Sequence, residues 1–449
     1  MHLLTRLHRS GLLASAVLAF AAGSVHAFDE DTEPPLYPSW SVKAPDEITT
    51  LTYDAGLSET ANGQRLKSAI QDLVPGDFLL VGPGTYSVDS LLDISKVATA
   101  AAPIRIVGAP GKRPVITRPN NGQNTINFGT GGSAAYLVLS GFELTGGDIG
   151  VRLHDVNHMV VDNCRIHGIT GTGIAVKSHD VSHIHLIGNE ITGTGGSPAG
   201  PSAGEGIYVG GNFGNPVAHD MVIARNWVHH TSGTQGDGIE IKQGSWGNWV
   251  MDNVIHDTPY PGLIAYGTGG KDRNVLARNV IWNSGDVALQ VQGEAIVRNN
   301  LAVAGDNGAF LSWDHQDLSV NLEVTHNTFV GYSEAARLKS WSGRPGMVFA
   351  NNACYSKFEH AIRFENGSTG VAVAGNVAFG AVQGLSSGYQ PGTGLNDFVG
   401  GSWKAENLLF FPKPGGVLAG SGSVNYSADR DILGTPRLAP FEAGAAELF

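Results

Sequence analysis

From residue 140 onward, the chain repeats one pattern of apolar and polar positions. Each repeat has a short apolar stretch, an asparagine, a second apolar stretch, a glycine-rich turn and a glycine followed by alternating apolar residues. Most successive asparagines lie 21 to 27 residues apart, the length of one β-helix coil. The pattern therefore predicts an all-β, right-handed parallel β-helix with asparagines stacked at one turn. They are Asn163, Asn189, Asn226, Asn253, Asn279, Asn300, Asn327, Asn352 and Asn376.

The alternating stretch after each glycine sets the register, because successive strand residues face opposite sides of a sheet. Every residue assigned to the interior is apolar. The inward columns are Val151, Ile174, Ile207, Ile239, Leu263, Leu289 and Leu153, Val176, Val209, Ile241, Ala265, Val291. A ligand lying on this sheet would contact the outward columns. These are Arg152, Ala175, Tyr208, Glu240, Ile264, Gln290 and His154, Lys177, Gly210, Lys242, Tyr266, Gln292.

One helix is predicted before the repeats. After Asn62-Gly63, residues Leu66, Ala69, Ile70 and Leu73 recur at helical spacing, and Pro75-Gly76 ends the pattern. We expect this short helix to cap the N-terminal end of the β-helix, within a cap at about residues 50–100. The stretch 384–449 is rich in Gly, Ser and Pro and is expected to wrap the C-terminal coils.

The first 27 residues resemble a secretory signal peptide, with Arg6, Arg9, an apolar run and Val25-His26-Ala27 before the expected cleavage point. We therefore expect a single β-helix domain over residues 28–449, secreted or periplasmic in a bacterium, monomeric and without a membrane span. Cys164 and Cys354 fall seven coils apart in the ladder, roughly 30 Å at about 4.8 Å per coil, which is too far for a disulfide.

Without the leader, 26 basic and 40 acidic residues leave a net charge of −14. This charge argues against a nucleic-acid partner. A polyanionic substrate would need a local cluster of cations that works against the field of the whole protein.

Tyr208 and Lys242 are the strongest candidates for chemistry. The register puts them on neighbouring coils in different outward columns, a diagonal spacing of roughly 7 to 8 Å that suits one sugar ring. Gly210 precedes Lys242 in its column and leaves room for a ring. The same positions predict a polysaccharide groove along this face.

A tyrosine and a lysine across one uronic acid suit β-elimination, in which the C5 proton is removed and the C4 oxygen is expelled. The reaction needs a base, an acid and cations that neutralise the carboxylate. Lys242 as base and Tyr208 as acid is one assignment, and the sequence leaves open which residue takes which role. The expected substrate-binding residues on the outward columns are Arg152, His154, Lys177, Glu240, Tyr266 and Gln290.

Gly204-Glu-Gly-Ile-Tyr-Val-Gly210 followed by Gly236-Asp-Gly-Ile-Glu-Ile-Lys-Gln-Gly244 resembles the catalytic region of the alginate lyases of polysaccharide lyase family thirty-one. The resemblance covers about the central third of the chain. It implies a single-domain β-helix whose essential tyrosine and lysine correspond to Tyr208 and Lys242, and an acidic polysaccharide, alginate first, as substrate.

Neighbouring families fit less well. Family six lyases carry Leu-Arg-His-Gly one coil after their lysine, where this chain has Ile264-Ala-Tyr-Gly267. Alginate C5-epimerases carry Asp-Pro-His-Asp, whereas Trp313-Asp-His-Gln-Asp317 has these residue types in another order. We interpret Asp314 and His315 as a turn or a distal sugar contact, and epimerisation stays a lesser alternative.

Two further functions remain open. Glu205, Asp237 and Glu240 fall on adjacent coils and would suit a glycoside hydrolase. A β-helix that binds or assembles exopolysaccharide without turnover would also explain the face and the acidic charge. Glu205 and Asp237 align in one turn and are able to share a cation, but we expect neither a required metal nor another cofactor.

Overall fold

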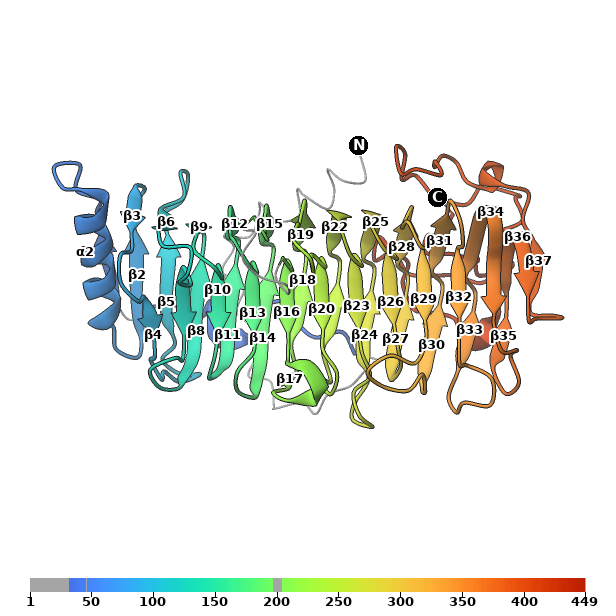
Figure 1. The fold of residues 1–449 in the computed structure, drawn as a ribbon, viewed down its shortest axis with the longest axis horizontal. Coiled ribbons are helices and arrows are strands. Elements are labelled where there is room, and N and C mark those ends of the chain that lie inside the picture. Colours follow the sequence, from blue (N-terminus) through green and yellow to red (C-terminus); the bar gives the residue numbers. More distant parts are fainter. Residues whose placement is uncertain (1–31, 46, 197–203, 449) are drawn as a thin grey trace. The chain divides into compact units, whose positions relative to one another are not determined.

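The computed structural model describes residues 32–45, 47–196 and 204–448. The chain forms two compact units, residues 1–236 and 237–449, and each is taken by itself below. Coil after coil of parallel strands builds both units (Figure 1), which confirms the predicted all-β, right-handed parallel β-helix. The predicted signal peptide lies outside the described residues, and the single domain over 28–449 stays a prediction.

Three parallel sheets run through the first unit. The first sheet contains β1 (Glu47–Leu51), β2 (Asp77–Val81), β5 (Ile104–Gly108), β8 (Ala134–Ser140), β11 (Val156–Asp162), β14 (Val181–Ile187) and β18 (Val222–Ala224), with β17 (Ala218–His219) beside β14. The second contains β3 (Thr85–Ser87), β6 (Val115–Arg118), β9 (Glu143–Gly146), β12 (Arg165–His167), β15 (Glu190–Thr192) and β19 (Trp227–His229). The third contains β4 (Asp93–Ile94), β7 (Ile126–Phe128), β10 (Val151–Leu153), β13 (Ile174–Val176) and β16 (Ile207–Val209).

The second unit repeats this three-sheet arrangement. Its first sheet contains β21 (Trp249–Met251), β24 (Asn274–Ala277), β27 (Ala295–Arg298), β30 (Leu322–Thr325), β33 (Val348–Ala350) and β35 (Ala372–Ala374). Its second contains β22 (Val254–Thr258), β25 (Val280–Ser284), β28 (Leu301–Val303), β31 (Thr328–Gly331), β34 (Ala353–Phe364), β36 (Asn376–Gln383) and β37 (Tyr389–Pro391). Its third contains β20 (Ile239–Ile241), β23 (Leu263–Ala265), β26 (Leu289–Val291), β29 (Phe310–Ser312), β32 (Ala336–Leu338) and again β34.

The predicted register of the third sheet is confirmed inside each unit. Ile174 pairs with Val151 on one side and with Ile207 on the other. In the second unit, Leu263 pairs with both Ile239 and Leu289. The inward residues are fully buried. The alternation therefore decides which side chains lie outside the coil, and these include the candidate site residues.

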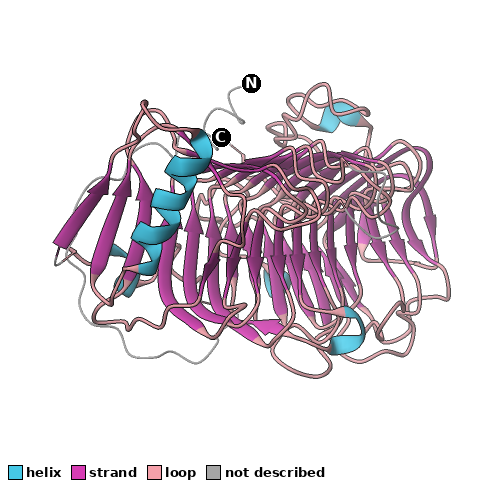
Figure 2. Ribbon diagram, turned by 60° about the vertical axis from the view of Figure 1, so that its left-hand side comes forward, coloured by secondary structure: helices cyan, strands magenta, loops and turns pink. Residues whose placement is uncertain are grey.

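The predicted helix is present as α2 (Glu59–Gln71), which is the long helix in Figure 2, and it packs beside β3. It begins before Asn62-Gly63 because the Ser58 hydroxyl accepts a hydrogen bond from the Ala61 backbone N–H at 3.1 Å and caps the helix. Leu66, Ile70 and the following Leu73 are buried, as the helical spacing predicts. None of the helices in the described residues is long and apolar enough to cross a membrane.

The asparagine ladder is present in each unit. Asn279 Oδ1 accepts hydrogen bonds from the backbone N–H of Asn253 at 3.1 Å and from its Nδ2 at 2.9 Å, and the same pair of bonds recurs from coil to coil up to Asn376. Each of these side chains is fully buried. The Nδ2 of Asn279 also donates to the Val250 carbonyl at 2.9 Å. The amides are therefore satisfied inside the coil without any ligand.

The sequence assignment of Asn163 to the ladder is wrong by one residue. Asn163 has φ +50° and belongs to the left-handed positions that precede the ladder, as do Arg278, Asn299 and His326 in later coils. The buried Cys164 takes the ladder position, and its backbone N–H donates to Asn189 Oδ1 at 3.0 Å. Cys164 and Cys354 are free, as predicted.

Segments outside the coils cover parts of both units. In the first unit the residues around the 3-10 helix η1 (Ser39–Val42) lie on the first sheet, and another short one, η2 (Asn212–Gly214), follows β16. In the second unit the chain after β37 contains η3 (Leu395–Asp397) and η4 (Val424–Tyr426). It returns to the coils, where Ala445 N donates to Thr328 Oγ1 at 2.9 Å.

We predict that Asn279→Ala lowers the free energy of unfolding by at least about 2 kcal/mol, because it leaves buried donors of Asn253 without an acceptor. Asn307→Ala is the control, since Asn307 donates to Asp286 Oδ1 at 2.8 Å on an exposed turn, and should cost under about 0.5 kcal/mol. Urea unfolding measures both changes. Equal losses would contradict a structural role for the ladder.

Acid should weaken the first unit through His185, which is 8% exposed and donates from Nδ1 to the Leu36 carbonyl at 2.8 Å. Burial lowers the pKa of His185 to about 4. The neutral form is therefore favoured in the fold, and its contribution is present above the ordinary pKa of about 6.5 and is lost as the pH falls from there toward 4.

The His185→Gln variant should consequently show a shallower decline in unfolding free energy between pH 6.5 and 4, with a difference of roughly 3 kcal/mol across the interval. Urea unfolding at several pH values measures it. His179→Gln, at an exposed position, controls for the loss of one histidine. An identical pH dependence of the unfolding free energy in the parent and in His185→Gln would refute the assignment of the acid sensitivity to His185.

Candidate functional site

In the first unit, the structure brings Tyr208 and Lys177 together on the outer side of the third sheet. Ala175 pairs with Tyr208 in the register of β13 and β16, and Lys177 follows β13. The Lys177 ammonium lies 4.7 Å from the centroid of the Tyr208 ring. Tyr208 is only 8% exposed, which is less than its place in an outward column suggests. A cation so close to the phenol attracts negative charge on that ring.

Arg152 and His154 belong to the preceding coil of the same unit. The Arg152 guanidinium donates to Ser178 Oγ at 2.5 Å, and the His154 ring lies 4.7 Å from that of His179. Both residues thus contact the chain that follows β13. The His154 Nδ1 is buried without a hydrogen-bond partner among the described residues. The first unit therefore gathers three of the predicted substrate-binding residues on two successive coils.

In the second unit, Lys242, Glu240 and Tyr266 form one cluster on the third sheet. The Lys242 ammonium forms a hydrogen-bonded ion pair with Glu240 Oε1 and lies 5.3 Å from the centroid of the Tyr266 ring. Lys242 is 6% exposed and Glu240 3%. Residues two apart on a strand share a face, so the strand itself sets the carboxylate beside the ammonium. The desolvated pair holds Lys242 in a fixed position.

Gln290 lies in the other outward column of the second unit and is nearly buried, between Ile264 and Leu311 in the register. Sequence reasoning considered His315 as a turn residue or a distal sugar contact, but it gave Trp313 no role on this face. Trp313 follows β29 at the position that Gln292 has after β26. Extending the column of alternating residues one coil further would have found it.

Tyr208 and Lys242 belong to different units. Their diagonal spacing, the predicted groove and the alignment of Glu205 with Asp237 therefore stay predictions. Within its own unit, Glu205 is buried and accepts a hydrogen bond from Thr172 Oγ1 at 2.7 Å. Asp237 is equally buried.

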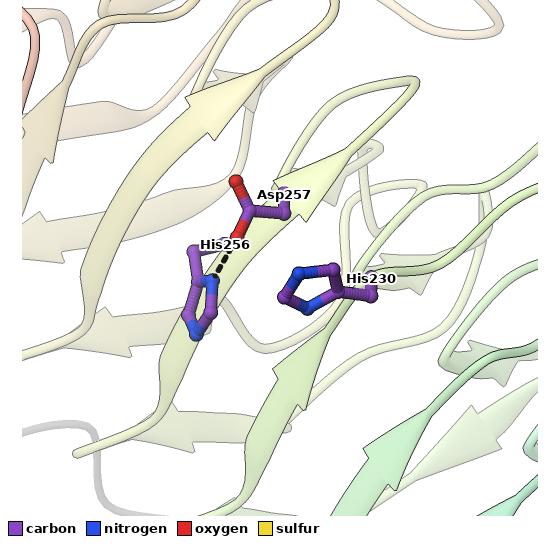
Figure 3. Close-up of side chains that lie close together, drawn as sticks. All are labelled: His230, His256 and Asp257. Atoms are coloured by element: carbon purple, nitrogen blue, oxygen red, sulfur yellow. Dashed lines mark hydrogen bonds and ion pairs between the residues drawn. The ribbon is translucent and has the colours of Figure 1, made fainter.

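In the described part of the second unit, one pair and one group of three side chains offer possible metal ligands. His256 Nδ1 lies 2.7 Å from Asp257 Oδ2 (Figure 3), and this pair alone offers fewer ligands than a structural zinc site needs. Glu334, Glu359 and His360 also lie close together. Glu334, however, accepts a hydrogen bond from Arg363 Nη1 at 2.7 Å, and a second guanidinium, that of Arg337, lies 3.4 Å away. These cations neutralise the carboxylate, and the second group does not resemble a cation site.

Two family models, both of right-handed β-helices, match parts of the chain. Residues 50–255 match the family described as Pel9A-like, right handed beta helix region. Residues 218–386 match the family described as right handed beta helix region. No curated protein sequence matches the chain.

Several solved structures share this fold, including the three that follow. Pectate lyase Pel9A is 14% identical, with 91% of this chain and 98% of that chain covered and a TM-score of 0.51. XylC in complex with xylose is 10% identical, with 86% and 95% covered and a TM-score of 0.58. A mutant of the PL6 family alginate lyase AlyGC is 12% identical, with 87% and 60% covered and a TM-score of 0.52.

These likenesses bear out the predicted resemblance to β-helix polysaccharide lyases at the level of the fold. They do not single out family thirty-one. Substrate and chemistry are consequently argued from the residues of this chain.

We predict that Glu240→Gln destabilises the protein by about 3 kcal/mol, because it leaves the Lys242 charge buried without its carboxylate. Glu365→Gln is the matched control. Glu365 pairs with Arg337 at 2.5 Å in the same unit, but both side chains are partly exposed, and the loss should be under about 1 kcal/mol. Urea unfolding distinguishes the two, and a loss at Glu240 no larger than that at Glu365 would contradict the interpretation of a desolvated pair.

Proposed function

We propose that this protein is a polysaccharide lyase that cleaves a uronate polymer, alginate in the first place, by β-elimination. The observation that carries the proposal is the nearly buried Lys242 ammonium, which Glu240 holds against the Tyr266 ring on the third sheet. A fixed, desolvated cation is what the reaction needs beside the substrate carboxylate, because negative charge develops there as the C5 proton leaves.

The contacts of Lys242 support one division of roles over the other. Because its ammonium already donates to Glu240, Lys242 suits charge neutralisation or proton donation better than proton abstraction. The Lys177 ammonium over the Tyr208 ring stabilises a phenolate. We therefore assign Tyr208 as the base that takes the C5 proton, and Lys242 as the cation that also donates a proton to the C4 oxygen as it leaves. This is the reverse of the first assignment considered from the sequence.

The remaining candidates bind substrate in this proposal. Lys177, Arg152 and His154 supply cationic and hydrogen-bonding groups in the first unit, as do Tyr266 and Gln290 in the second. The fold supports the reaction class, since pectate lyase Pel9A and the alginate lyase AlyGC share it. We also propose that the protein is secreted or periplasmic, because a polymeric substrate is met outside the cytoplasm.

A glycoside hydrolase is less well supported. Of its three candidate carboxylates, Glu205 accepts from Thr172 and Glu240 is paired with Lys242. A hydrolase needs one carboxyl group as an acid and the other as a nucleophile or base. The pairing of Glu240 with an ammonium works against either role.

Incubation with alginate or another polyuronate should generate the ultraviolet absorbance of an unsaturated uronate. We expect Tyr208→Phe and Lys242→Ala each to lower the initial rate by about a hundredfold or more, because each removes a group that acts on the transferring proton or the developing charge. Tyr260→Phe and Lys357→Ala, at exposed positions of the second unit, are the matched controls and should keep the parent rate.

The same assay includes a neutral glycan and a chelator. Reducing ends released without absorbance, together with sensitivity to Glu205→Gln, would overturn the proposal in favour of a hydrolase. Binding without release of any product would favour a binding or assembly role. A change in mannuronate to guluronate ratio without cleavage would identify an epimerase.

A further inference from the structure

Three rings lie in sequence along the third sheet of the second unit. The His315 ring lies 5.8 Å from the Tyr266 ring and 5.0 Å from the Trp313 ring, to which it is nearly parallel, at 5°. The Lys242 ammonium lies 5.3 Å from the centroid of the Tyr266 ring, and the Lys339 ammonium lies 5.0 Å from the centroid of the Trp313 ring. His315 therefore lies in the interval between the Tyr266 and Trp313 rings, and each of these rings also has a lysine ammonium beside it.

The interval exists because of the coil register. Gln292 N donates to the Ala265 carbonyl, and Gln290 pairs with Leu311 in the register of β26 and β29, so the outward column runs from Tyr266 through Gln292 to Trp313. Tyr266 and Trp313 are thus two coils apart, roughly 10 Å at about 4.8 Å per coil. One planar or pyranose ring fits between two aromatic rings at this separation.

Gln292 lies beneath this interval and is the least satisfied side chain of the column. It is fully buried, and neither its Nε2 nor its Oε1 has a hydrogen-bond partner among the described residues. In the chain that follows β29, Trp313 Nε1 and Gln316 Oε1 are also buried and have no hydrogen-bond partner among the described residues. A buried amide with both a donor and an acceptor unused is unusual in a native protein and indicates a missing partner.

His315 reaches the interval from a loop and not from a strand. The loop after β29 returns over the two preceding coils, where a Cβ on Gly267 would lie 2.8 Å from Asp317 Oδ2 and one on Gly293 would lie 2.5 Å from the Leu318 carbonyl. At Gly293 the close atoms belong to the loop backbone, and only glycine allows this approach. Asp314 anchors the loop by accepting from Ser319 N at 2.8 Å and from Arg344 Nη2 at 2.9 Å. His315 itself is exposed.

We propose that the interval between Tyr266 and Trp313 is a binding site for one sugar ring of an acidic polysaccharide, and that His315 fills it until the ligand displaces it. The choice of a uronate as ligand rests on the proposed function. The sugar ring stacks between the two aromatic faces, and its hydroxyl groups donate to and accept from the Gln292 amide. The Lys339 ammonium beside the Trp313 ring, 4.0 Å from Glu365 Oε2, adds positive charge that favours a sugar with a carboxylate.

Because His315 competes with the ligand, the apparent affinity is reduced by the fraction of molecules in which the interval is filled. His315→Ala should therefore strengthen binding, whereas His315→Phe, a larger ring without hydrogen-bonding groups, should weaken it. Opposite effects of two substitutions at one position separate this role from a general loss of folding.

The experiment measures dissociation constants by calorimetry for mannuronate, guluronate and galacturonate tetrasaccharides and for xylotetraose. Every variant also carries Tyr208→Phe so that turnover does not consume the ligand. We expect His315→Ala to lower the dissociation constant for an acidic tetrasaccharide at least about fivefold. Gln292→Leu, added to His315→Ala, should abolish this gain in affinity. Leu318→Ala, which changes an exposed side chain of the same loop, is the control and should have no effect.

An unchanged or weaker affinity of His315→Ala, or a gain that persists in Gln292→Leu, would overturn the proposal. A gain restricted to xylotetraose would overturn its acidic ligand. These outcomes are independent of the lyase assay. If no polyuronate yields an unsaturated product but His315→Ala still gains affinity for an acidic tetrasaccharide, the proposed reaction fails and the binding site stands.

Discussion

The asparagine ladder is the interaction on which the rest of each unit depends. Each amide bonds the next coil and a backbone carbonyl, and the residue before it turns the chain with a positive φ, as Arg278 does before Asn279. Because these buried amides are costly to leave unpaired, consecutive coils are held in one register. That register stacks equivalent positions at about 4.8 Å along the axis. Side chains distant in sequence thereby become neighbours, which is how Lys242, Tyr266 and Trp313 come to share one column.

Much of the fold could be predicted because two independent periodicities agree. The spacing of the asparagines gives the coil, and the alternation of Ile239 and Ile241 with Glu240 gives the face. The ladder assignment failed only at Asn163, where an asparagine occupies the left-handed position and the buried Cys164 replaces the ladder amide. Both residue types are compatible with these positions, so the sequence pattern alone does not distinguish them.

The candidate site was predicted less completely, for a physical reason. Residues on strands, such as Tyr208 and Glu240, follow from the alternation. His315 lies in a loop that approaches Gly293 through its backbone and Gly267 through the Asp317 side chain, and loops have no periodic pattern. Burial was also missed. Tyr208 and Lys242 are 8% and 6% exposed although they lie in outward columns, because neighbouring side chains of the stacked coils cover them. Sequence alternation gives the direction of a side chain but not what packs over it.

The pairing of Glu240 with Lys242 shows how the sheet constrains chemistry. Two residues of one strand separated by a single position must share a face. The strand therefore holds the Glu240 carboxylate on the same face as the Lys242 ammonium. The pair withdraws the ammonium from proton abstraction and fixes its position in a desolvated setting, where its charge acts more strongly than in water. Tyr208, which has the Lys177 ammonium over its ring, has the complementary environment. The setting of Tyr208 favours loss of its proton, whereas the setting of Lys242 favours retention of its charge. This difference, more than the identity of the two residues, supports an elimination with separate base and cation.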